Sequence, residues 1–250
     1  EGQQQMLART GLAIADSLSA FHTEFGLQNQ PNRLGTNQIY GHPLSRPPIV
    51  DGYFDDWPVD SRSMSELADA GNNIQFIAAL YGSYFYLFVD AADSNVIYRD
   101  AGAGNTFARY SDRVSLVSAS ESANIVMFDF QPEAPGPLVP RRISDGDIAA
   151  ERSILAHWQD TPLGFRLEAR VPRRLIGERI GVVVTNTAQR ENPGIRLASF
   201  AGDLPGHFVA PSSQIQSFVG GYAQDGLRVI VTDRSGWRLA TAGDVNVSTS

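Results

Sequence analysis

The stretch that decides the fold is "IVDGYFDDWPVD", residues 49–60. It places two aromatic rings, a tryptophan and four acids within a dozen positions, directly after Pro47 and Pro48. Those prolines restrict the chain to extended geometry as it enters Ile49. Three interpretations suit such a stretch: a metal-binding loop, a platform for a sugar ring, or the first corner of a β-sandwich. The sequence around it decides among them.

The composition sets the bounds. A chain of 250 residues with 42% hydrophobic and 19% charged residues is typical of a globular protein with a real core. The net charge of −7 argues against a nucleic-acid partner, because phosphates require a basic face. The absence of cysteine excludes disulfides, zinc–thiolate sites and thiol catalysis. No apolar run approaches the roughly 20 residues that a membrane span needs.

The first 25 residues have a helical rhythm, with a heptad-like apolar stripe made of Leu7, Gly11, Ile14, Leu18, Phe21 and Phe25. Two interpretations are open: an amphipathic helix packed on its own domain, or a helix that continues from a membrane span and pairs with its twin. Residues 1–5 contain no N-cap signal, which favours a helix that begins upstream and hence a fragment of a longer chain. Residues 26–46 are rich in Gly, Pro and Asn and predict a linker.

Residues 47–202 are dominated by short strands. "NIQFIAALYG" and "YFYLFVDAAD" alternate apolar and other residues around a turn at Gly82 and Ser83. In "GFRLEARVP", residues 164–172, apolar side chains alternate with Arg166, Glu168 and Arg170, which predicts one buried and one solvated face. Many short strands without long helices between them predict a mainly β fold, an antiparallel β-sandwich.

The order of "IVDGYFDDW", the hairpin ending in "YLFVDAAD", "SDRVSLVSAS" and "GFRLEARVPRRLIG" resembles the carbohydrate-binding-module-9-like (CBM9-like, DOMON-like) sandwich. The resemblance covers roughly residues 47–200. In this interpretation Asp51 and Gly52 make a turn, and Trp57 plugs the end of the sandwich. The opening stretch is then mainly architecture.

A second resemblance covers nearly the whole chain. The heptad-like helix, "IYGHPLSRPPIVDGYFDDW", "VIYRDAG", "RLEARVPRRLIG" and "RVIVTDRSGWRLA" follow one another as in the extracytoplasmic sensor region of transmembrane histidine kinases, particularly that of the proteobacterial dedicated sortase system. "PSSQIQSFVGG" predicts a short helix, and Val229, Val231 and Leu239 predict a hairpin turned at Ser235 and Gly236. We therefore expect a smaller α+β sensor-like unit, made of the first helix and residues 203–242, before a tail at residues 243–250.

Two functions from different classes follow. The kinase resemblance implies a periplasmic ligand-sensing domain on the bacterial inner membrane, with its membrane spans outside this sequence and a helical homodimer that transmits the signal. The alternative is a carbohydrate-binding module of a secreted or surface enzyme. The terminal helix and hairpin favour the sensor, whose ligand would be a small molecule, a glycan or a periplasmic protein. No catalytic motif is visible, and His22, His42, His157 and His207 are isolated, so we expect no enzyme in this fragment.

The best ligand-binding candidates lie at residues 94–104, where Tyr98 offers a stacking face, Arg99 a bidentate donor and Asp100 an acceptor. A well-bonded loop with no ligand suits the same residues equally. Tyr84 and Tyr86 form a second candidate platform, and coverage of both by the N-terminal linker suits the same residues equally. Calcium is a further candidate ligand, because five acids outside this loop could supply oxygen ligands, namely Asp51, Asp55, Asp90, Asp93 and Asp112. Capping of turns and strand ends is the favoured role for these acids, so no cofactor is expected.

Overall fold

The structure is a computed structural model that describes residues 8–9, 11–13, 38–67, 73–100, 102, 110–187, 195–222, 227–233 and 236–243. The chain divides into two compact units, Thr36–Pro211 and a second unit that combines Glu1–Gly35 with Ser212–Ser250. We call them the sandwich unit and the terminal unit. None of the described helices is long and apolar enough to cross a lipid bilayer.

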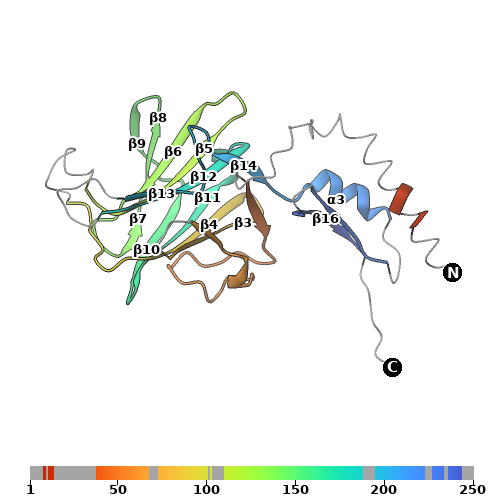
Figure 1. Cartoon of the computed structure of the whole chain (residues 1–250), viewed down its shortest axis with the longest axis horizontal. Helices are drawn as coiled ribbons and strands as arrows, with labels where there is room; N and C mark the ends of the chain where they lie inside the picture. Colours follow the sequence, from red (N-terminus) through yellow and green to blue (C-terminus); the bar gives the residue numbers. More distant parts are fainter. Residues whose placement is uncertain are drawn as a thin grey trace. The chain divides into compact units, whose positions relative to one another are not determined.

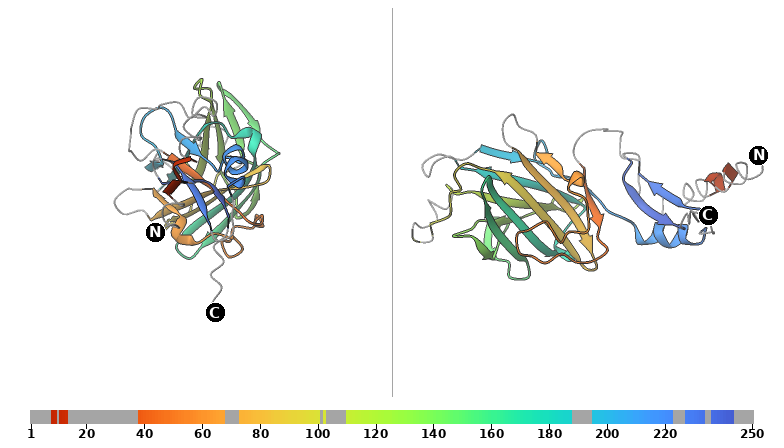
Figure 2. Two further views of the ribbon diagram at one scale, coloured as in Figure 1. Left: turned by 90° about the vertical axis from the view of Figure 1, so that its right-hand side faces the viewer. Right: turned by 90° about the horizontal axis from the view of Figure 1, so that it is seen from below.

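The sandwich unit contains two sheet layers joined along one edge (Figure 1). The first layer has the strand order β7-β10-β11-β4-β3, with β2 also on β3; these are Gly136–Leu138, Leu155–Thr161, Gly164–Pro172, Tyr84–Ala92, Ile74–Tyr81 and Ser65–Leu67. The second has the order β14-β12-β5-β6-β8-β9, with β13 on β12; these are Gly206–Val209, Arg179–Asn186, Arg113–Ala119, Ile125–Phe130, Arg141–Ser144, Asp147–Ala150 and Ile195–Ala198. Figure 2 shows the same unit from two further directions.

Strand β1, Gln38–Pro43, connects the layers. Residues 38–40 pair in parallel with β14, and residues 41–43 pair in parallel with β3. This strand lies in the segment predicted as a linker, and β14 lies in the segment assigned to the smaller unit, so both predicted boundaries were wrong. The reason is that these strands are short and interrupted by Gly or Pro, which leaves too few alternating positions to reveal a strand.

The interior of the sandwich follows the predicted alternation. Phe85, Leu87 and Val89 of β4 point inward and are fully buried, and they share one core with Leu116 and Phe128 of the opposite layer. Because successive side chains of a strand point to opposite faces, one apolar face from each layer is enough to build this core. The predicted mainly β sandwich is confirmed, and its described strand pairs are antiparallel except for the two parallel pairs made by β1.

The terminal unit contains α3 (Ser213–Gly220) and a hairpin of β15 (Val229–Thr232) and β16 (Arg238–Ala242). The hydroxyl oxygen of Ser212 accepts a hydrogen bond from the amide of Ile215 at 3.2 Å, which caps the helix as the serine signal predicted. Ile215, Val219 and Leu239 are buried in this unit.

The predicted helix over residues 1–25 is described only at residues 8–9 and 11–13, which are helical. The stripe residues other than Gly11, the proposed pairing of two helices, and all of the predicted tail at 243–250 except Gly243 lie outside the described residues. The helix pairing therefore stays a prediction.

Candidate functional site

Residues 44–64 lie over the outer face of β3 and β4 and form a second apolar cluster with them, which we call the cover cluster. Trp57 belongs to it and is only 5% exposed. Its ring stacks on Phe54 at a centroid distance of 5.5 Å and meets Phe88 edge-on at 5.9 Å. Trp57 was predicted to plug the end of the sandwich, and this prediction was wrong. The side chain is instead buried against the outside of one layer, because the segment that carries it folds back over that layer.

Glu168 on β11 holds this segment in place. Its Oε2 accepts hydrogen bonds from the amides of Asp51 and Gly52 at 3.0 and 2.9 Å, and its Oε1 accepts one from Nε1 of Trp57 at 2.8 Å. The side chain is fully buried, so the prediction that it faces solvent was wrong. Burial raises the pKa of Glu168 to about 7, although the three hydrogen bonds oppose that change by favouring the carboxylate.

Gly52 is required at the point where residues 44–64 lie against the sheet. Its φ is +87°, and a Cβ at this position would lie 2.6 Å from Cβ of Gln159 on β10. Any other residue would combine a strained backbone with a clash. Asp51 and Gly52 thus form the expected turn, and Oδ1 of Asp51 accepts a hydrogen bond from the amide of Tyr53 at 3.0 Å.

Beside the cover cluster, the same outer face carries a line of polar side chains, one from each strand. Cross-strand pairs join Glu66 to Gln75, Gln75 to Asp90, Asp90 to Arg166, and Arg166 to Gln159. On β3, β4 and β11, the residues directly before and after each of these polar residues point into the core, so the polar side chains point outward. We call Glu66, Gln75, Asp90, Arg166 and Gln159 the polar row. All five are half-buried or exposed.

The polar row presents both donors and acceptors. Nε of Arg166 donates to Oδ2 of Asp90 at 2.9 Å, and Nε2 of Gln75 donates to Oε1 of Glu66 at 3.3 Å. The side chains of Arg166 and Asp90 are 33% and 37% exposed. Since a guanidinium has five N–H groups and the bond to Asp90 uses one, the pair is held in position and still offers hydrogen-bonding groups at the surface.

An exposed aromatic residue stands near the β10 end of the polar row. Tyr53 is 47% exposed and directly follows Gly52, whose Cα faces Gln159. The turn made by Asp51 and the anchor made by Glu168 fix the backbone on which this ring is carried. Tyr53 is therefore exposed at the surface, on a backbone that these hydrogen bonds hold to β11.

The loop residues predicted to bind a ligand do not converge on one site. The hydroxyl of Tyr98 donates to the carboxylate of Asp160, and burial raises the pKa of Tyr98 while its ring packs against the main core. Arg99 forms a 3.6 Å ion pair with Glu133. The amide of Gly102 donates to Oδ1 of Asp100 at 2.9 Å. Each side chain thus has a partner in the protein, two of them outside the loop, which agrees with the alternative of a well-bonded loop without a ligand.

Tyr84 and Tyr86 do not form an open platform. Tyr86 is 1% exposed within the cover cluster, so no ligand can stack on its ring. Tyr84 is half-buried, and the guanidinium carbon of Arg170 lies 4.6 Å from the centre of its ring. The prediction failed because residues 44–64 cover this face.

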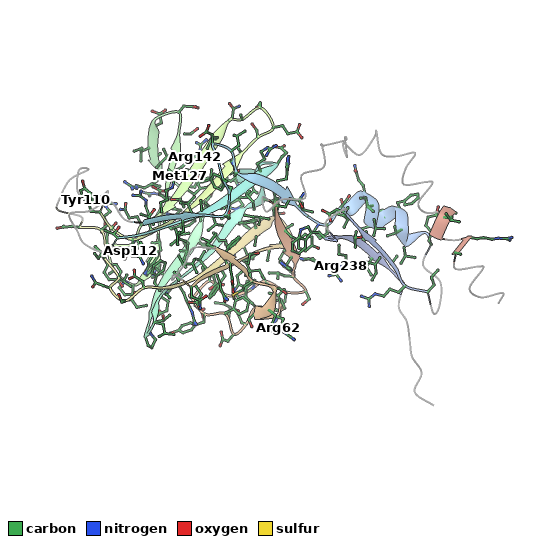
Figure 3. All side chains as sticks on the ribbon, viewed as in Figure 1. Arg62, Tyr110, Asp112, Met127, Arg142 and Arg238 are labelled. Carbon is green, nitrogen blue, oxygen red and sulfur yellow. The ribbon has the colours of Figure 1, made fainter. Side chains whose placement is uncertain are left out.

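The acids considered for calcium are not gathered at one site, although Asp93 and Asp112 lie near each other. Asp51 caps the turn at Tyr53, and Asp90 is paired with Arg166. Asp112, at the end of the sandwich unit where β5 begins (Figure 3), is fully buried and accepts hydrogen bonds from the amides of Ile97 and Thr187 at 2.5 and 2.6 Å. Burial raises the pKa of Asp112 to about 7, and the nearby Asp93 adds to this. Within the residues that the structure describes, no three His, Asp or Glu side chains are grouped as a metal site would need.

Sequence reasoning did not find the polar row as a site. It singled out Asp90 only as an oxygen donor for calcium, and it placed Arg166 on a solvated face without giving it a role. The available signal is the outward set of the alternation in three predicted strands, which includes Gln75, Asp90 and Arg166. What is lacking is the register that aligns them, and β2, which carries Glu66, gives no pattern of its own.

No protein-family model matches the chain, and no curated protein sequence matches it. Among solved structures, the chain is similar to a carbohydrate binding module family 9 (CBM9) from Caldicellulosiruptor kristjanssonii in complex with glucose, at 12% identity over 69% of this chain and 95% of the other, with a TM-score of 0.46. A CBM9 from the same organism in complex with cellotriose has 13% identity over 71% and 96%, with a TM-score of 0.47. Both TM-scores lie below 0.5.

Proposed function

We propose that the sandwich unit is a non-catalytic carbohydrate-binding module whose ligand lies along the polar row. The observation that carries the proposal is the register of planar polar side chains across neighbouring strands, together with the exposed Tyr53, which follows the Gly52 that lies against Gln159. A sugar presents hydroxyl groups that both donate and accept, together with an apolar C–H face. Carboxylate, amide and guanidinium groups match the hydroxyls, and an aromatic ring matches the apolar face.

The arrangement favours binding over catalysis. Catalysis needs a nucleophile or an acid–base pair that converges on one bond of the substrate. The polar row instead distributes its groups one per strand, and its two central charges, Asp90 and Arg166, are bonded to each other. Such a surface holds a ligand through many separate contacts.

A sensory role is the second candidate, and it rests on the sequence resemblance together with one observation. The first 35 residues and the last 39 belong to one compact unit, between whose parts the sandwich unit is inserted. In a receptor, glycan binding by the sandwich unit would be the input, and the terminal unit would connect to the membrane. The kinase, the periplasmic location and the dimer stay predictions.

The test is a binding screen of the purified protein against soluble glycans of different linkage, by calorimetry. We expect Arg166→Ala to lower the affinity for a bound glycan at least tenfold, because a charge-assisted contact is lost. Arg142→Ala is the matched control: Arg142 is an exposed arginine of β8 in the other layer (Figure 3). Thermal melting of both variants verifies folding. Failure of every glycan to bind, or equal affinity for the two variants, would contradict the proposal.

A further inference from the structure

We infer that the polar row binds one extended, neutral glycan chain that runs across the strands, and not a single sugar or the flat surface of a crystalline polysaccharide. This inference rests on the proposed function and adds the class of ligand. It follows from the length of the polar row, its twist and its charge.

The length comes from the spacing of the strands. The five residues occupy β2, β3, β4, β11 and β10, which lie side by side in that order. Neighbouring strands are roughly 4.8 Å apart, so the four intervals from Glu66 to Gln159 span roughly 19 Å. A single pyranose ring would contact only a small part of that line. Rings in an extended chain advance by a step similar to the strand spacing, so successive rings would meet successive polar side chains.

The twist of the sheet selects the form of the chain. Neighbouring strands rotate by roughly 20–25°, so a line across four intervals turns by roughly 80–100°. A rigid, flat polysaccharide crystal can contact only a short part of such a line. A single soluble chain, whose glycosidic torsions can adjust, can follow the full length of it.

The charges select the chemistry of the chain. Glu66 and Asp90 carry negative charge, and Arg166 is bonded to Asp90, so the uncompensated charge of the polar row is negative. The whole chain is also negative, at −7. A polyanionic glycan would be repelled by this surface, whereas neutral hydroxyl groups can bond to carboxylate, amide and guanidinium alike.

The experiment is calorimetry of the intact protein with oligosaccharides of one to six units, in β-1,4-glucan, β-1,3-glucan and α-1,4-glucan series. For the linkage that binds, we expect the affinity to rise about fivefold with each added ring, as one net hydrogen bond per ring provides, and to level off near five rings. Sedimentation with crystalline cellulose should remove no protein from solution.

Variants at one end of the polar row locate the chain. Glu66→Ala should reduce the affinity for the pentasaccharide about fivefold and leave the trisaccharide unchanged, because three rings can occupy the remaining positions. Asp147→Ala, on exposed β9, is the matched acidic control and should change neither. An affinity independent of length, with Arg166→Ala still disruptive, would overturn the extended site and leave carbohydrate binding standing. No binding in any series would overturn both.

Discussion

Replacing Trp57 with alanine is expected to destabilise the sandwich unit strongly, although Trp57 lies in a loop segment. The side chain is 5% exposed and packs between Phe54 and Phe88. Burial of a tryptophan side chain removes roughly 200 Å² of apolar surface from contact with water, which at about 25 cal/mol per Å² corresponds to about 5 kcal/mol. Measured truncations of buried aromatic residues cost about 3–5 kcal/mol, so the two estimates agree.

The loss of the indole N–H adds to this cost. Nε1 of Trp57 donates to Oε1 of Glu168 at 2.8 Å, and the alanine variant leaves that buried oxygen without this donor. An unsatisfied buried group costs about 1–3 kcal/mol. The sum is roughly 4–8 kcal/mol, against the roughly 5–15 kcal/mol by which a domain is stable in total.

Urea denaturation followed by far-UV circular dichroism measures the effect. Tyr53→Ala is the control from the same stretch: its side chain is 47% exposed, so its free energy of unfolding should change by no more than about 0.5 kcal/mol. Trp57→Phe keeps one aromatic ring but removes the N–H and the second ring of the indole, so it should cost more than the roughly 1–3 kcal/mol of the unsatisfied acceptor and less than Trp57→Ala. It provides the measurement if the alanine variant fails to fold. Equal unfolding midpoints for Trp57→Ala and Tyr53→Ala would refute the reasoning.

Three further predictions concern polar side chains that form specific hydrogen bonds. Because burial raises the pKa of Glu168 from 4.5 to about 7, the folded state binds that proton more tightly than the unfolded chain, so the free energy of unfolding should fall as the pH rises from about 4.5 to about 7. Glu168→Gln should reduce this fall between urea titrations at pH 5 and pH 8; an unchanged fall would disprove the assignment to Glu168. Asp112→Ala leaves the amides of Ile97 and Thr187 without their acceptor and should cost roughly 2–4 kcal/mol in thermal melting, which a wild-type midpoint would exclude. In the terminal unit, Gln216 donates to the carbonyl of Thr241 at 2.6 Å and accepts from its amide at 3.0 Å. Gln216→Ala should therefore speed hydrogen exchange of the Thr241 amide about tenfold. An unchanged exchange rate would contradict this prediction.

The parts of the fold that the sequence predicted are those with a local signal. The hairpin of β3 and β4 follows from alternation and the turn at Gly82, and α3 follows from its serine cap and apolar face. Strand β1 could not be predicted in this way, because it is held by pairing with β14 and β3, which are far from it in sequence. Pairing between distant segments has no local pattern from which it can be read.

The same distinction between local pattern and distant pairing holds for the candidate site. The outward side chains of Gln75, Asp90 and Arg166 follow from the alternation within their own strands, but their alignment with one another and with Glu66 and Gln159 depends on the registers of β2, β3, β4, β11 and β10. The loop at Tyr98 and Arg99 has a suitable composition for binding a ligand, yet its side chains bond to Asp160 and Glu133. Composition indicates which chemistry is available, and only the tertiary contacts determine which groups are still available to a ligand.

Glu168 and Arg166 show most directly what each level determined. They lie two residues apart on the same side of β11, and the alternation of "GFRLEARVP" alone established that both point away from the core. The tertiary structure decided that Arg166 stays at the surface in the polar row while Glu168 is fully buried under residues 44–64. The physical reason is that alternation determines only the side of the sheet on which a residue lies. Whether that side is in water depends on a segment more than a hundred residues away, and Glu168 binds that segment through the amides of Asp51 and Gly52.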